Sequence, residues 1–542
     1  MDEESLDEMI LRGAEPLRSP DIKRAVSCAE TCNGINSLAA DVSQSAVSSR
    51  WRGQRLVAAI TCLLIAGCAV GPDFKRPAAP DVSGFTATPL STTASSPTVA
   101  GGESQSFILG ADVSGDWWTL FHSQPLDDLI EQSLKANHDL RAAQAALSVA
   151  RENVLAQRGA FFPNVTGSFS ATRQRQSAVL APTPSSNALQ YSLYTPQVSV
   201  SYAPDVFGLN RRGAESVKAQ EQAVRFEMIA AHLTLTTNVA VAAIQEASLN
   251  AQIDATRQLI DIDTKSVQTL QYQLAKGYAS RLDVAAQESQ LAQVSATLPP
   301  LLKQLAQQRD LLAVLCGRYP SQAPAADFEL SSLTLPQDLP VSLPSALVAQ
   351  RPDVLQAEAN MHAASAQVGV AIANRLPNIE LTANAGSTAA ALGQVFSSGT
   401  GFWALGAAAT APIFDGGTLL HQERAAKAVY VQASEQYRST VLGAFQNVAD
   451  TLTALQQDAE SLKAAAAAAD AAKVTLDLTQ RQWSDGYASY LSLLGAQQAY
   501  QQARINLVQA QAGRLADTAA LFQALGGGWW RRPELAKDKY EH

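Results

Sequence analysis

Histidine and cysteine side chains, which often bind metals or act in catalysis, are few and scattered in this chain of 542 residues. Cys28 and Cys32 have a spacing found in metal sites, but no histidine accompanies them. The sequence contains no H-E-x-x-H, G-x-S-x-G or phosphate-loop motif. The histidines are His122, His138, His232, His362, His421 and His542. We therefore expect no enzyme, no metal site and no cofactor other than a covalently attached lipid.

That lipid is expected on Cys68. Three arginines between residues 50 and 55 precede an apolar run of 11 residues, from Leu56 to Ala66. This pattern is typical of a secretory signal, and 11 residues are too few to span a bilayer. The letters IAGC, which end at Cys68, resemble a bacterial lipobox, in which the cysteine is lipidated and becomes the new N-terminus. Ala69 follows where an aspartate would favour the inner membrane. The alternative is an ordinary cleaved signal with an incidental cysteine.

The predicted cleavage removes residues 1–67, and residues 1–49 are either an untranslated stretch or a real extension. Residues 68–116 are rich in Pro, Ser, Thr, Ala and Gly, and we interpret them as an extended, lipidated tether. We expect packing to begin at the letters WWTLF, residues 117–121. Cys316 then has no disulfide partner.

The composition favours long helices over a compact enzyme. Charged residues make up 16% of the chain and aromatic residues 6%, and the formal net charge is −9. No basic stripe is present to neutralise phosphates, so nucleic acid is not an expected partner.

An internal repeat organises the rest of the chain. Pro163 and Pro377 open similar segments, and so do Pro204 and Pro412. The letters GYAS recur at Gly277 and Gly486. We expect a first copy over residues 117–330, a second over residues 331–526, and a tail over residues 527–542. One loop is six residues shorter in the second copy.

Each copy predicts a β-hairpin, over about residues 163–204 and 377–412. Apolar and polar residues alternate on both sides of a polar loop, as in strands with one apolar face. A proline-free stretch of about 66 residues follows each hairpin, roughly 100 Å as a helix. Heptads of apolar residues, for example Ile253, Ile260, Val267 and Leu274, predict coiled-coil packing. Pro299 and Pro300 interrupt the return helix of the first copy, but the heptads continue, so we expect a kink and no end.

The repeated GYAS letters mark the turns of two antiparallel helical hairpins, near residues 276–281 and 485–489. Gly277 and Gly486 suit the left-handed conformation that ends a helix. Ser280 and Ser489 are placed to cap the return helices.

Four strands of about 9–13 residues are long enough to cross a bilayer but cannot close into a barrel. Because a membrane sheet must close, several chains must pool their strands. Two chains would supply eight strands and a filled interior, whereas three would supply twelve and leave room for a conduit. The alternative is a non-conducting coiled-coil envelope lipoprotein.

The repeat, the GYAS letters, WWTLF, GPDFKRP after Cys68, and the segment Arg351–Leu381 together resemble the TolC-like outer-membrane factor family, in particular its NodT-type efflux lipoproteins. The resemblance implies a mainly α homotrimer with a small β part. A twelve-stranded β-barrel would lie in the outer membrane above a periplasmic α-barrel of helical hairpins. It further implies export of drugs or other small molecules, with a periplasmic adaptor and an inner-membrane pump, of the RND type, as partners. A conduit for type I protein secretion is the runner-up.

The family also implies a periplasmic gate, closed at rest. Leu491 matches a constricting apolar ring, and residue 495 lies one turn deeper. Many relatives carry Asp at 495 and some at 492, whereas this chain has Gly495 and Ser492. An acidic, cation-binding ring is therefore not expected. Leu491 as an ordinary helix-packing residue is the alternative.

Asp283 matches an acidic position of the family. We expect Asp283, Arg281 and Asp485 to form weak salt bridges between hairpins that hold the tube shut. The alternative for Asp283 is a charge that stabilises the start of a helix. The tip residues Gly277, Tyr278, Gly486 and Tyr487 are expected to dock the adaptor.

Overall fold

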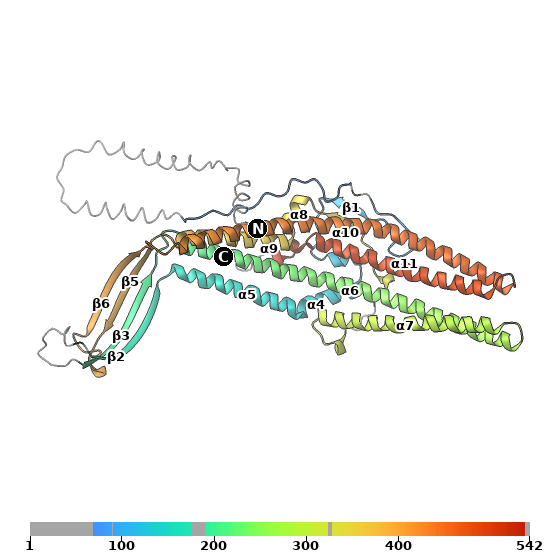
Figure 1. The fold of residues 1–542 in the computed structure, drawn as a ribbon, viewed down its shortest axis with the longest axis horizontal. Helices are drawn as coiled ribbons and strands as arrows, with labels where there is room; N and C mark the ends of the chain where they lie inside the picture. The colour runs from blue at the N-terminus through green and yellow to red at the C-terminus, as the bar shows by residue number, and fades with distance from the viewer. Residues whose placement is uncertain are drawn as a thin grey trace, which may run out of the picture. The chain divides into compact units, whose positions relative to one another are not determined.

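In a computed structural model, the described residues are 69–88, 90, 92–175, 177, 190–323 and 328–536. Cys68 and the predicted signal lie outside them. The two β-hairpins and the two helical hairpins expected from the repeat are present. The strands lie at one end of the helices and the helical turns at the other (Figure 1).

The four long strands form one antiparallel sheet in the order β2-β3-β5-β6. They are β2 (Asn164–Arg175), β3 (Gln190–Tyr202), β5 (Asn378–Ser387) and β6 (Gly401–Thr410). Each copy supplies one hairpin, and β3 pairs with β5 to join the copies, with Val200 opposite Ala383. This leaves β2 and β6 as the two edges. Most of the loop at the tip of the first hairpin lies outside the described residues.

The long helices have the same lengths in both copies. These are α6 (Leu209–Ala275) and α10 (Thr418–Ser484), each of 67 residues, and α7 (Arg281–Leu315) and α11 (Tyr490–Ala524), each of 35. As predicted, α7 continues through Pro299 and Pro300. Both prolines are exposed, so water can reach the carbonyls that they leave without a helical donor.

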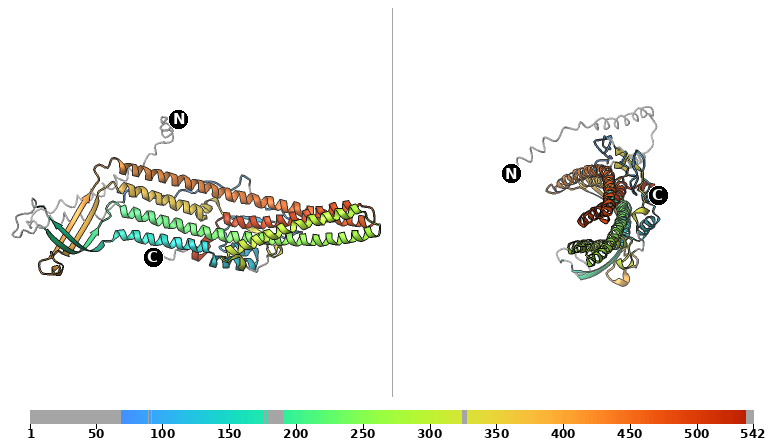
Figure 2. Two further views of the ribbon diagram at one scale, coloured as in Figure 1. Left: turned by 60° about the horizontal axis from the view of Figure 1, so that its bottom comes forward. Right: turned by 90° about the vertical axis from the view of Figure 1, so that its right-hand side faces the viewer.

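The helices form a single curved wall (Figure 2). α6 packs against α5 (His138–Arg158) and α9 (Pro352–Ala373) toward the strands, and against α7 and α11 toward the tips. α10 packs against α9 and α11. The order across the wall is therefore α5, α6, α9, α10 near the strands and α7, α6, α11, α10 near the tips. α10 forms one side of the wall, and α5 with α7 forms the other.

The main hydrophobic core lies where short elements cover the middle of the wall. Trp117, from the short helix η2 (Trp117–Phe121), stacks on Phe522 of α11 with 5.3 Å between ring centroids. α4 (Gln124–Ala136) and α8 (Pro344–Gln350) contribute further apolar residues. The chain ends here with η7 (Trp529–Arg531) and α12 (Pro533–Ala536), and Arg532 lies over the ring of Trp118.

The prediction that packing begins at Trp117 is wrong. Thr93 and Gln105 are buried, and β1 (Ser106–Leu109) pairs in parallel with β4 (Asp338–Val341). The segment is extended, as expected, but it lies against the helices. Polar contacts hold it there: Gln105 donates to the Pro336 carbonyl at 3.0 Å and to Thr518 Oγ1 at 3.1 Å. The described chain therefore has a second, small sheet beside the expected four strands.

Among the described helices, α6 is long and apolar enough by composition to cross a membrane. More than half of its most apolar window is buried inside the protein, as in the central helix of a packed wall.

Candidate functional site

Both helical hairpins reverse through the same backbone motif. Gly277, with φ of 80°, follows the end of α6, and its N–H donates to the Leu274 carbonyl at 3.0 Å. The N–H of Tyr278 donates to the Gln273 carbonyl at 2.8 Å. These two bonds form a Schellman motif, which satisfies the last carbonyls of a helix and needs a left-handed residue.

The second tip repeats this geometry. Gly486 has φ of 82° and donates to the Trp483 carbonyl at 3.0 Å, while Tyr487 donates to the Gln482 carbonyl at 2.8 Å. The prediction that Gly277 and Gly486 end the long helices in the left-handed conformation is therefore confirmed.

The return helices are capped by the predicted serines, but the two caps differ. Ser280 Oγ accepts from the Asp283 N–H at 3.1 Å, and Asp283 Oδ2 accepts from the Ser280 N–H at 3.0 Å, which completes a capping box. At the second tip Ser489 Oγ accepts from the Ser492 N–H at 3.2 Å. The Ser492 hydroxyl lies 2.9 Å from Ser489 Oγ and returns no bond to the backbone of Ser489. The second cap therefore has one reciprocal bond fewer.

The three residues predicted to form salt bridges lie at the tips but do not pair with one another. The Asp283 carboxylate binds the Ser280 N–H and, at 2.7 Å, its hydroxyl. Arg281 and Asp485 are exposed. None of the ion pairs in the described residues joins Arg281, Asp283 and Asp485. Within one chain, Asp283 is thus a capping residue, and the salt bridges stay a prediction for contacts between chains.

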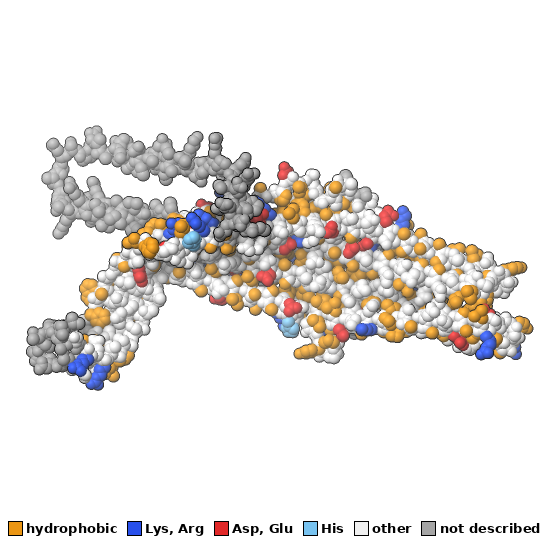
Figure 3. All heavy atoms as spheres, in the orientation of Figure 1, with side chains coloured by type: hydrophobic (Ala, Val, Ile, Leu, Met, Phe, Trp, Pro, Cys, Tyr) orange, Lys and Arg blue, Asp and Glu red, His pale blue; other side chains and the backbone are white. Residues whose placement is uncertain are grey.

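The expected gate residues share one exposed face of α11. Leu491 is 60% exposed, and Ser492 and Gly495 are exposed beside it. The aromatic rings of the tips are more exposed, at 86% for Tyr278 and 87% for Tyr487. Apolar and aromatic side chains gather at the ends of both helical hairpins (Figure 3). A surface of this kind suits contact with another protein.

A buried polar network just behind the tips was not predicted. Gln287 Nε2 of α7 donates to Asp263 Oδ1 of α6 at 3.0 Å, and the Tyr490 hydroxyl of α11 donates to Gln287 Oε1. All three residues are buried. Because Tyr490 belongs to the second hairpin, this network joins the two hairpins of one chain. Asp263 lies three residues after Ile260 and four before Val267, so a carboxylate at a helix-packing position was the available signal.

The surroundings of the network keep water away from it. Leu270, Val284 and Leu493 form an apolar cluster with Tyr490, and the Trp483 ring lies edge-on to the Tyr490 ring at 5.7 Å. Burial raises the pKa of Asp263, which its hydrogen bond from Gln287 opposes. Burial also raises the pKa of Tyr490, with smaller contributions from the charges of Asp263 and Asp283. The phenol therefore remains a neutral donor.

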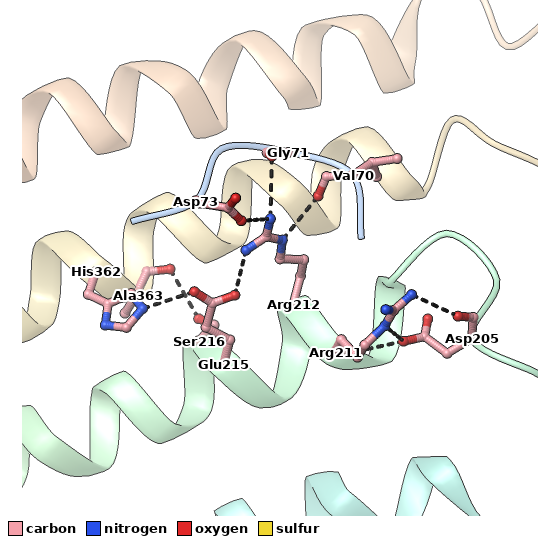
Figure 4. A network of polar contacts seen from close by, with 10 residues as sticks. All are labelled: Val70, Gly71, Asp73, Asp205, Arg211, Arg212, Glu215, Ser216, His362 and Ala363. Carbon is pink, nitrogen blue, oxygen red and sulfur yellow. Dashed lines mark hydrogen bonds and ion pairs between the residues drawn. The ribbon is translucent and has the colours of Figure 1, made fainter. Parts of the chain in front are cut away.

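A second polar network holds the first described residues near the strand end of α6 (Figure 4). Arg212 is buried, and its guanidinium donates to the Val70 carbonyl at 3.0 Å, to Asp73 at 2.7 Å and to Glu215 at 2.7 Å. Glu215 also contacts His362 Nε2 at 2.9 Å. The chain immediately after Cys68 is thus fixed to α6.

The Phe74 ring strengthens this attachment by stacking on His362 with 4.3 Å between centroids. His362 belongs to α9, so the start of the described chain contacts both central helices of the wall. In the described residues no group of three or more His, Cys, Asp or Glu side chains could hold a metal ion.

Comparison with known proteins identifies the family. The family model described as outer membrane efflux protein matches residues 129–318 and 343–527, one stretch in each copy of the repeat. The toluene efflux pump outer membrane protein TtgC of Pseudomonas putida is 31% identical over 494 residues, which cover 89% of this chain and 97% of the relative. The pyoverdine export outer membrane protein OpmQ of the same species is 30% identical over 419 residues, which cover 76% of this chain and 88% of the relative.

Among solved structures, the outer-membrane channel OprN superposes with a TM-score of 0.77 at 26% identity, covering 85% of this chain and 100% of that chain. This agreement extends over the strands, the helical wall and both tips, and it confirms the resemblance derived from the sequence. The chain therefore belongs to the outer membrane efflux protein family.

Proposed function

We propose that this protein is the outer-membrane channel of a tripartite efflux system and exports drugs or other small molecules. The observation that carries the proposal is the open sheet at one end of the helical wall. The names of two relatives, one for toluene efflux and one for pyoverdine export, support small molecules over proteins as the exported class.

The sheet needs further copies of the chain to close. β2 and β6 are edge strands, and every residue of both is exposed. Apolar side chains on them, such as Phe169, Trp403 and Leu405, have no cover in one chain. Unpaired edges join other strands readily, and a sheet in a bilayer must satisfy all its backbone groups. Three copies would close twelve strands around a channel wide enough for solutes.

The helical wall has matching unpaired sides. An exposed stripe on α10 consists of Leu420, Val431, Leu442, Val474 and Leu478. Spacings of 11 residues bring side chains back to nearly the same face after about three turns. On the other side of the wall, α5 and α7 expose Val149, Leu155 and Val314. We infer that α10 of one copy packs against α5 and α7 of the next, so that three walls form a tube about 100 Å long.

The tips would face the periplasm and dock the adaptor. Tyr278 and Tyr487 offer exposed aromatic rings for that contact, and Gly277 and Gly486 set the turns that present them. Leu491 would narrow the entrance as an apolar ring, because a narrow apolar pore excludes water. Gly495 and Ser492 add no charge to this ring, and Arg281, Asp283 and Asp485 would pair between chains.

The anchor belongs to the same arrangement. The Arg212 network holds residues 70–73 near the strands, so a lipid on Cys68 would reach the membrane that the strands cross. Mass spectrometry of the mature chain is expected to find a lipid-bearing Cys68 at its N-terminus, and an unmodified cysteine there would refute the anchor.

Purified full-length protein in planar bilayers tests the channel and its gate. The complex is expected to have the mass of three chains and to conduct ions. Leu491→Ala should raise the single-channel conductance severalfold, because smaller side chains widen the ring. Leu282→Ala is the matched control, since Leu282 is exposed at the first tip. A wild-type complex that never conducts contradicts the channel, whereas unchanged conductance in Leu491→Ala contradicts only its role in the gate.

A further inference from the structure

Two carboxyl groups face each other in the middle of the second helical hairpin, far from the tips. Asp458 comes from α10 and Asp517 from α11, and they lie within hydrogen-bonding reach of each other. Asp458 Oδ2 is shielded from solvent, and no donor reaches it from the described residues. Ionised carboxylates only accept hydrogen bonds. The two groups can therefore bond to each other only if one of them keeps a proton.

The surroundings make two negative charges costly at this place. Leu455 and Ala459 of α10 and Leu515 and Ala519 of α11 are buried around the pair. Charges removed from water in an apolar environment are destabilising unless they are paired. The position of the pair in the core between two helices thus favours the protonated form.

Arg514 is the nearby cation, but its hydrogen bonds go elsewhere. This residue of α11 is 1% exposed, and its guanidinium donates to the Gly101 carbonyl at 2.7 Å, the Glu103 carbonyl at 2.6 Å and Thr93 Oγ1 at 2.9 Å. These partners belong to residues 93–105, which we call the strap. None of the ion pairs in the described residues links Arg514 to either aspartate. Arg514 therefore attracts the pair from a distance without closing a salt bridge.

The balance of these effects favours a proton on the pair near neutral pH. Burial, then the hydrogen bond and the charge of Asp517, raise the pKa of Asp458 to about 7, while Arg514 lowers it. Asp517 and Arg514 face Asp458 from α11, and Glu103 of the strap acts on Arg514.

We propose that Asp458 and Asp517 share one proton and form a clasp between α10 and α11 that tightens when the surrounding medium becomes acidic. Such a clasp would make the rigidity of the second hairpin depend on pH in a protein exposed to the pH of the periplasm. The proton comes from the medium and returns to it, so the step needs no other reactant. This device is independent of whether the protein conducts.

The expected direction follows from the two pKa values of Asp458. The ordinary value is 3.8, and the folded value is about 7, so between them the folded hairpin holds a proton that the opened hairpin releases. The stabilisation is complete below pH 3.8, decreases as the pH rises to about 7, and is absent above it.

Hydrogen–deuterium exchange on the full-length protein in detergent tests the clasp. Backbone protection around residues 452–463 and 511–521, corrected for the intrinsic exchange rate, is compared at pH 5.5 and pH 8. In the wild type, protection should be on the order of tenfold higher at pH 5.5. In Asp458→Asn the amide can donate to Asp517 at both pH values, so the difference should disappear. Asp470→Asn, which removes an exposed carboxylate of the same helix, should keep it.

Asp517→Asn provides an independent variant if Asp458→Asn does not fold, and it too should lose the pH dependence. The clasp is refuted if the wild type shows equal protection at both pH values. It is also refuted if either asparagine variant retains the wild-type difference.

Discussion

The long helices of the two copies are equal in length but differ in their surroundings. α6 and α10 each have 67 residues, yet α6 is packed on several faces whereas α10 is buried along one stripe. α6 lies between four other helices, and α10 lies at the side of the wall. The repeat thus determines length, while the place in the wall determines which faces are covered. α10 is the helix whose exposed apolar face calls for a neighbouring chain.

The strongest test of this difference is a charge on the open face of α10. Leu442 is 72% exposed, so Leu442→Arg should leave the fold of a single chain intact but abolish the three-chain complex, because burying an unpaired charge in an interface is costly. Native mass spectrometry in detergent measures the number of chains. Gln436→Arg, exposed on a third face of the same helix, is the control and should leave the complex assembled. A Leu442→Arg trimer would show that this face is not an interface.

A smaller effect is expected where the two hairpins of one chain meet. Tyr490→Phe removes the hydroxyl that binds Gln287 and leaves a buried acceptor without a donor, which should cost about 1–3 kcal/mol locally. Faster hydrogen exchange at the start of α11 would measure the loss. Tyr487→Phe is the control, since the Tyr487 ring is exposed at the tip. Equal exchange in Tyr490→Phe and the wild type would mean that the network does not hold the hairpins together.

The smallest effect concerns the two caps. Ser280→Ala breaks a capping box and should destabilise the first turn of α7 by about 1 kcal/mol. Ser489→Ala breaks a cap with fewer bonds and should destabilise α11 less. Exchange rates of the first-turn amides compare the two, and a larger loss at Ser489 would contradict the difference between the tips.

The regular parts of the fold could be predicted from the sequence. Strand alternation, heptads and the paired glycines identified all four long strands and both helical hairpins, because these signals are local and repeated. β1 and β4 were missed because four residues each carry no measurable period. The attachment of the tether was missed because Gln105 and Arg514 meet across about 400 residues of chain.

The site was predicted less completely than the fold. Gly277, Gly486, Ser280 and Ser489 could be placed because backbone geometry demands these residue types at a helix reversal. The Tyr490 network could not, since hydrogen bonds between hairpins depend on how the helices pack. For Asp283, the acidic position suggested a salt bridge, but the nearest donor is the backbone at the start of its own helix.

The matched helix lengths have a consequence for evolution of the chain. Since α6 and α10 start together at the sheet and turn after the same number of residues, both turns extend equally far from the membrane side of the protein. In a ring of such chains the six turns would form a level rim, which a flat partner can meet all at once. A seven-residue insertion in only one copy would leave alternate turns protruding by about 10 Å, so length changes must enter both copies together.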